Sequence, residues 1–394
     1  MKKKLFVILL MFSMIGFAQE SKKTEGYSVN KKKLGFTATD SLFQVNIGFR
    51  IQSRAGFEKT EGENGFYEGE VRRMRLKLDG FVYNPKFGYK IELGFAAKDM
   101  VTLDNKNGNV ILDAVFFYHP TKNWTIAFGQ TKLPGNNQRV ISSGSLEFTD
   151  RTINNSQFNI DRDFGLFVDY SHENPTKFAY SLKGAITKGE GRNWVKTEDD
   201  GIALTAKAEL FPLGSFTKHG SLFEADLERE KSLKWMISGA FSQNNNALRK
   251  QGQLGSELFE PRTIKSLFFD TMLKYRGWSA IGAYMSSMCN DPVTVNPLDV
   301  TKTQSVFVGY GIDTQLSYVF PSNYQIGARF SIQKADDEIH ANVPDADEYA
   351  IGVSRYILGH KLKFQTEFSY RKDKFVSGDT SGTWYVRGQV EIGI

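Results

Sequence analysis

The chain has 394 residues, and its 50 Lys and Arg exceed its 44 Asp and Glu, which gives a formal net charge of +6. The first 18 residues hold three lysines and no acid, so the remainder carries +3, too mild a charge to indicate a nucleic-acid partner. Cys289 is the only cysteine, which excludes an intramolecular disulfide.

Residues 1–18 have the pattern of a secretory signal peptide. Three lysines at positions 2–4 precede an apolar run over 5–17, and small residues flank Phe17 where signal peptidase cuts. The run is shorter than the roughly 20 residues that a membrane-spanning helix requires. We therefore expect export and cleavage after Ala18.

Residues 19–40 are polar and rich in lysine, without apolar periodicity. This composition predicts a flexible leader on the periplasmic side of an outer membrane. Residues 41–394 show one pattern throughout, so we expect them to form a single domain.

That pattern is an alternation of apolar and polar residues in short segments. In Leu42–Gln52, Phe43, Val45 and Ile47 take one parity and polar residues take the other. Because successive strand side chains point to opposite faces, each segment predicts a strand with one apolar face. About sixteen such segments follow one another: 42–52, 70–83, 86–98, 109–119, 123–131, 163–172, 177–187, 201–211, 233–243, 263–276, 277–287, 303–320, 323–334, 347–357, 360–371 and 383–394.

The connections between these segments alternate in length. Tight turns such as Asn84-Pro85 and Pro321-Ser322 follow the even-numbered segments, with 212–232 as a long exception. Longer connections follow the odd-numbered segments: 53–69, 99–108, 132–162, 188–200, 244–262, 288–302, 335–346 and 372–382. Short periplasmic turns and long extracellular loops are typical of outer-membrane barrels. The predicted fold is thus all-β, a transmembrane antiparallel barrel of about 16 strands.

One segment carries a row of cations. Arg73, Arg75 and Lys77 share one parity, and the apolar Met74 and Leu76 take the other. Since a Lys or Arg at mid-membrane on the lipid face costs about 2–4 kcal/mol, the cations are expected to face the lumen. Such a row favours anions in a pore. The alternative is an ion-paired wall, in which facing acids such as Glu92 or Glu391 balance the cations. By parity, Arg72 belongs to the lipid face.

The sequence around this row resembles a known family. Arg72-Arg73-Met74-Arg75-Leu76 with Gly80 is similar to the Arg-Arg-x-Arg-Leu…Gly signature of the phosphate-selective porin O/P family. Three further motifs of that family have counterparts in the same order: Gly129-Gln130-Thr131-Lys132-Leu133-Pro134, Phe148-Thr149-Asp150-Arg151 and Asp161-Arg162-Asp163-Phe164-Gly165. The resemblance implies a trimeric sixteen-stranded porin for anionic or small hydrophilic solutes. Carried over to this sequence, it marks five residues as pore-side candidates: Arg73, Arg75, Lys132, Arg151 and Arg162.

The connection 132–162 is the longest after an odd-numbered segment. It contains Arg139 and several amides, and connections of this length are usually functional or disordered. Two arrangements remain open, a polar loop folded into the lumen and a disordered external loop.

No enzyme, cofactor or metal site is expected. The five histidines lack metal-ligand spacing, and no strained Gly-x-Ser-x-Gly turn is present. We therefore predict an outer-membrane porin for passive diffusion of small hydrophilic solutes, in particular anions such as phosphate. Its expected partners are membrane lipid, lipopolysaccharide and two further copies of the chain. The alternative is a barrel with a blocked lumen that acts in surface adhesion or envelope assembly.

Overall fold

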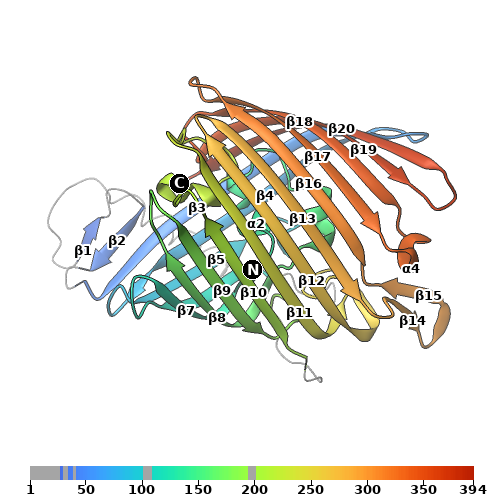
Figure 1. The fold of residues 1–394 in the computed structure, drawn as a ribbon, viewed down its shortest axis with the longest axis horizontal. Helices are drawn as coiled ribbons and strands as arrows, with labels where there is room; N and C mark the ends of the chain where they lie inside the picture. The colour runs from blue at the N-terminus through green and yellow to red at the C-terminus, as the bar shows by residue number, and fades with distance from the viewer. Residues whose placement is uncertain (1–26, 30–33, 39–40, 101–108, 194–200) are drawn as a thin grey trace, which may run out of the picture.

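Sixteen antiparallel strands form a closed barrel (Figure 1). The computed structural model describes residues 27–29, 34–38, 41–100, 109–193 and 201–394, so the predicted signal peptide 1–18 lies outside the described residues. The barrel closes where β20 pairs with β3, from Thr383 opposite Thr60 to Gly393 opposite Arg50. In chain order the barrel strands are β3 (Phe43–Thr60), β4 (Phe66–Val82), β5 (Phe87–Gly94), β6 (Ile111–Tyr118), β7 (Trp124–Lys132), β8 (Arg162–His172), β9 (Ala179–Thr187), β10 (Ala203–Phe211), β11 (Lys234–Arg249), β12 (Glu257–Tyr275), β13 (Trp278–Cys289), β16 (Gly309–Val319), β17 (Tyr324–Ala335), β18 (Asp345–Tyr356), β19 (Leu362–Lys374) and β20 (Thr380–Gly393).

The barrel has an apolar outside and a polar inside. On β19, Phe364 and Phe368 are exposed, whereas Gln365, Glu367 and Ser369 between and beside them are buried. This reverses the distribution of a water-soluble protein and fits an outer face that meets lipid. Among the described residues, no helix has the length and apolar content needed to span a bilayer.

Aromatic rings gather near the end of the barrel that carries the short turns. Trp124 packs on Tyr170 and Trp278 on Tyr318, each pair with ring centroids 4.9 Å apart. Such rings mark the membrane interface of a barrel because they combine an apolar body with a polar edge.

The strand order is as predicted, but several strands extend further than their apolar pattern. β3 continues to Thr60 and β4 begins at Phe66, so the predicted connection 53–69 shrinks to 61–65. The connections 250–256 and 375–379 are short for the same reason. These extensions lie beyond the apolar band of the outer face. Ion pairs such as Arg387–Glu68 occupy their inward face.

Two further departures concern pieces outside the barrel wall. The predicted segment 303–320 divides, since residues up to Ser305 belong to a separate hairpin of β14 (Val293–Asn296) and β15 (Asp299–Ser305). Within the predicted flexible leader, Tyr27–Val29 and Gly35–Ala38 form strands β1 and β2. β2 pairs with β3 from Gly35 opposite Asn46, and it covers an edge that β20 does not reach.

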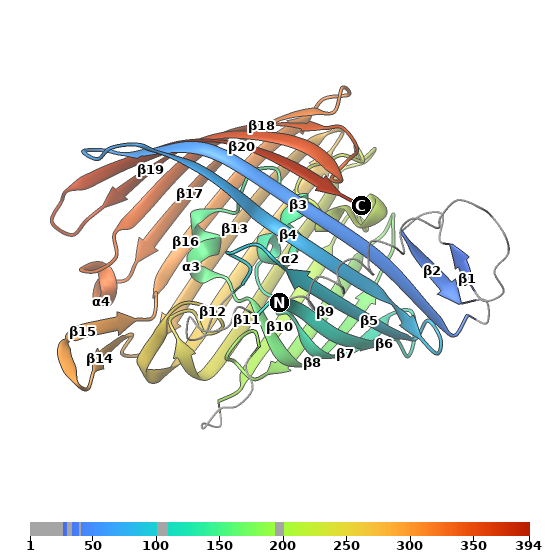
Figure 2. The same cartoon turned by 180° about the vertical axis from the view of Figure 1, so that it is seen from behind.

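Two connections leave the barrel wall, and the helices of the first lie inside the barrel (Figure 2). The first, residues 133–161, is called the lumen loop and contains α2 (Asn137–Val140), η2 (Ser143–Ser145) and α3 (Ile153–Phe158). The second, residues 212–233 at the short-turn end, is called the insert and contains η3 (Thr217–Leu222). The long exception predicted at 212–232 is therefore an irregular segment that reaches the barrel interior.

Candidate functional site

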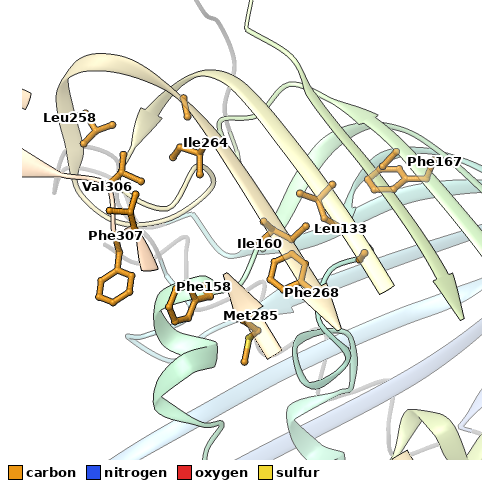
Figure 3. Close-up of a cluster of buried hydrophobic side chains, with 14 of the residues drawn as sticks. Leu133, Phe158, Ile160, Phe167, Leu258, Ile264, Phe268, Met285, Val306 and Phe307 are labelled. Carbon is orange, nitrogen blue, oxygen red and sulfur yellow. The ribbon is translucent and has the colours of Figure 1, made fainter. Parts of the chain in front are cut away.

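Apolar packing fixes the lumen loop inside the barrel. Leu133, Phe158 and Ile160 of the loop lie in one buried cluster with Phe268 and Met285 of the wall (Figure 3). Burying these side chains together stabilises the loop by roughly 1.5–3 kcal/mol for each one. Of the two arrangements left open by the sequence, the structure has the loop that folds into the lumen.

The cations that frame the loop hold its backbone in place. Lys132 donates from Nζ to the carbonyls of residues 139–141, at 2.9, 2.9 and 3.3 Å. Arg151 donates to the carbonyls of Gln138 and Ile141, both at 2.9 Å. These carbonyls lie at the end of α2, where helix carbonyls have no partner within the helix. Both cations therefore bind dipoles of the loop backbone.

A β-bulge turns a further cation into the lumen. The register between β3 and β4 shifts between Gln52 and Ser53, so that Arg72 and Arg73 occupy one bulge. Arg72 then points inward, where its Nε donates to Asp150 at 2.9 Å. The prediction that Arg72 has lipid parity is wrong, because the bulge adds one residue and changes the parity.

Asp150 of the lumen loop collects three arginines from two strands. Its carboxylate lies 3.3 Å from Arg54 of β3, 2.8 Å from Arg72 and 3.1 Å from Arg73 of β4. Arg73 is 3% exposed, whereas the Asp150 side chain is 26% exposed. The loop is thus tied to the wall by one carboxylate that water still reaches.

The other two cations of the predicted row have acidic partners as well. Arg75 bonds to Glu92 at 3.0 Å and to Asp99 at 2.7 Å. Lys77 lies 3.0 Å from Asp79 on its own strand. The row therefore exists as an inward-facing row of cations, and each member is ion-paired, as in the alternative that named Glu92.

A cavity of about 250 Å³ lies between this wall and the lumen loop. Arg50, Arg75 and Lys77 line it together with the acids Glu92 and Glu391. Arg75 and Lys77 are thus the predicted residues that border this space.

The remaining predicted residues form an ion-paired cluster at the base of the loop. Arg139 donates from Nε to Asp161 at 3.0 Å, and Arg162 donates from Nε to Asp113 at 2.8 Å. Arg162 also lies 3.8 Å from Asp161, which links the two pairs. The structure thus brings Lys132, Arg139 and Arg162 together around the two ends of the lumen loop.

Several residues of this site were missed by sequence reasoning. Arg50 and Arg54 have the inward parity of β3, which could have indicated them, but Arg54 was placed in a loop. Asp113 and Asp99 gave no such signal, because the residues around Asp113 are apolar on both parities and Asp99 falls in the predicted connection 99–108. Across the ranges that the structure describes, no group of three or more His, Cys, Asp or Glu residues is arranged to hold a metal ion.

The model of the phosphate-selective porin O and P family matches residues 45–206, which confirms the resemblance seen in the motifs. This stretch includes all the cations singled out from the sequence: Arg73, Arg75, Lys77, Lys132, Arg139, Arg151 and Arg162. No curated protein has a matching sequence.

Solved structures with a similar fold are outer-membrane proteins. The outer membrane channel DcaP of Acinetobacter baumannii is 15% identical with a TM-score of 0.54, over 91% of this chain and 99% of that chain. The trimer form of OmpT of Vibrio cholerae is 12% identical with a TM-score of 0.50, over 88% of this chain and 99% of that chain. The chain therefore has the fold of an outer-membrane porin, a closed barrel of sixteen strands.

Proposed function

We propose that this chain, which has a porin fold and the sequence signature of the porin O and P family over residues 45–206, is a passive outer-membrane channel that favours small anions. Phosphate is among the solutes to be tested, because the family model carries that description. The family match and the barrel fold both suit a channel without enzymatic activity. The cationic residues Arg73, Arg75, Lys77, Lys132, Arg139, Arg151 and Arg162 are proposed to set the ion preference.

One observation carries the anion preference. In the described part of the chain, no carboxylate lies within salt-bridge distance of Lys132 or Arg151, whose hydrogen bonds go to backbone carbonyls. Arg151 lies within electrostatic range of three arginines, Arg139, Arg73 and Arg75, and of one carboxylate, Asp150. Carbonyl dipoles stabilise a cation without cancelling its charge, so this side of the lumen keeps an excess of positive charge.

The proposed setting is the outer membrane, reached through a cleaved signal peptide, with lipid and lipopolysaccharide around the apolar face. We propose a homotrimer, supported by the family resemblance and by the trimer form of OmpT. Multi-angle light scattering in mild detergent is expected to give three chains per particle, and a uniform monomer would contradict the trimer but not the channel.

The filled interior favours a second candidate function. The lumen loop and the insert together occupy part of the barrel interior, as a barrel used for surface adhesion or envelope assembly would allow. Such a protein would have no conducting path.

Planar-bilayer recording separates the two candidates. The channel is expected to give steady conductance steps and, in a salt gradient, a reversal potential on the anion side. Replacing chloride by phosphate then ranks the two anions. Absence of steps from folded, heat-modifiable protein would refute the channel and support the second candidate.

A further inference from the structure

The insert is the one connection at the short-turn end that departs from a tight turn, among the residues that the structure describes. The others, at 83–86, 119–123, 173–178, 276–277, 320–323 and 357–361, hold two to six residues. The insert has 22 residues over 212–233 and contacts the lumen loop through Phe216 and Glu224. Connections of this length in a compact fold are usually functional or disordered.

Apolar side chains join the insert to the lumen loop. Phe216 of the insert lies in a buried cluster with Ile141 and Leu146 of the loop. Met236 of β11 and Met272 of β12 complete the cluster from the wall. The loop is thus packed against the insert on the face that points to the short-turn end.

Glu224 forms the polar part of this contact and bonds to three residues of the loop. Its carboxylate accepts from the backbone N–H of Glu147 at 2.8 Å and from Nε2 of Gln138 at 3.0 Å. Its own backbone N–H donates to the carbonyl of Ser145 at 3.1 Å. Glu224 is 2% exposed, so its bonds form away from water and resist exchange.

The insert is itself fixed to the barrel wall. Lys274 of β12 donates to the carbonyls of Gly220, Phe223 and Ala225 at 2.8, 2.8 and 2.9 Å. Ser279 of β13 donates to the carbonyl of Glu224 at 2.6 Å. These bonds transmit the rigidity of the wall to Glu224.

The stretch of loop that the insert holds is the stretch that binds the unpaired cations. Gln138 and Ile141, which touch Glu224 and Phe216, supply the two carbonyls that Arg151 binds. The carbonyl of Ile141 is also shared by Lys132. A shift of this stretch would therefore change the positions of both cations in the lumen.

We propose that the insert is a second determinant of ion preference and that Glu224 is its positioning residue, which fixes the loop carbonyls that Lys132 and Arg151 bind. This rests on the proposed channel function. Glu224 acts through the loop and needs no contact with the solute.

The sign of one substitution separates this role from a direct effect of charge. Glu224→Ala removes a negative charge, which by itself would raise anion preference. If Glu224 positions the loop, the same variant loosens the cations and lowers the ratio of anion to cation permeability, by about twofold or more. Glu224→Gln removes the same charge but keeps one acceptor oxygen, so its ratio is expected to equal or exceed that of the parent.

The exposed Glu228→Ala serves as the matched control, since Glu228 pairs with Lys218 at 2.8 Å away from the loop and no change is expected. A decrease for Ala with none for Gln or the control supports the proposal. Equal increases for Ala and Gln would overturn it, because charge alone then accounts for the effect.

Hydrogen–deuterium exchange of the full chain in detergent gives a readout that does not depend on conduction. Peptides covering 138–150 are expected to exchange about tenfold faster in Glu224→Ala than in the parent, while those of β12 are unchanged. Unchanged exchange over 138–150 would refute the positioning role. Faster exchange in a protein that forms no channels would refute the channel and leave the support of the loop established.

Discussion

Replacing Asp150 by Asn removes the carboxylate that three arginines share. Arg54 keeps its ion pair with Glu70, whereas Arg73 loses its only carboxylate partner within the described residues and keeps the bond to Gln52 at 2.8 Å. Leaving a buried charge unpaired costs about 3–5 kcal/mol. Because the Asp150 side chain is 26% exposed, water lowers this cost, and we expect a loss of about 2–3 kcal/mol in the free energy of unfolding.

The same substitution is expected to raise the anion preference, although it lowers the free energy of unfolding. A unit charge about 5 Å from an ion in water changes its energy by about 0.8 kcal/mol, or about fourfold in permeability. Removing the negative charge of Asp150 is therefore expected to raise the anion to cation ratio by about fourfold. The gain should shrink in 1 M salt, where the Debye length falls to about 3 Å.

The assay is the reversal potential in a salt gradient, measured beside denaturant unfolding in detergent. Asp299→Asn provides the control, since it removes the same charge from the exposed β14–β15 hairpin, where Asp299 pairs with Lys302. The control should leave both readouts unchanged. An unchanged or more cationic preference in Asp150→Asn would refute the electrostatic reasoning for this wall.

Three further predictions concern selectivity, topology and pH. Arg75→Gln is expected to move the reversal potential toward cation preference, because it removes a positive charge that lines the cavity and leaves Glu92 and Asp99 without this partner. An unchanged reversal potential would show that Arg75 has no part in ion selectivity. In a Cys289→Ser background, an impermeant thiol reagent added to intact cells should label Ser377→Cys but not Asn84→Cys, and labelling at 84 would invert the topology. Burial, followed by two nearby lysines, lowers the pKa of His360 well below its usual range, so the folded state stays neutral while the unfolded state binds a proton below about pH 6.5. The free energy of unfolding should therefore fall as pH drops from about 6.5, and it should fall less steeply in His360→Gln. Denaturant titration at several pH values measures both slopes, and identical slopes for the parent and the variant would contradict this assignment.

The strand pattern could be predicted from the sequence because it depends on local geometry. Alternation along Leu42–Gln52 or 383–394 decides which side chains face lipid. It can be recognised in the sequence of one strand, without knowledge of the neighbouring strands. The inward direction of Arg73, Arg75 and Lys77 follows from the same rule. Strand ends were less predictable, since pairing continues past the apolar band wherever inward charges find partners.

The partners of the cations could not be predicted, since they are contributed by other parts of the chain. Asp150 meets Arg73 across 77 residues, and Glu391 lies 3.5 Å from Arg50 across most of the chain. One bulge residue was enough to reverse the predicted direction of Arg72, because strand parity changes with every inserted residue.

The sequence by itself determined a sixteen-stranded barrel with a row of cations on its inner face, since period-two alternation and turn residues act over short distances. Only the tertiary structure decided what fills the lumen. Whether the loop 133–161 enters the barrel depends on Phe268 and Met285 across from it, and whether the insert supports that loop depends on Glu224 and Lys274. Such contacts are fixed by barrel closure, which no local pattern records.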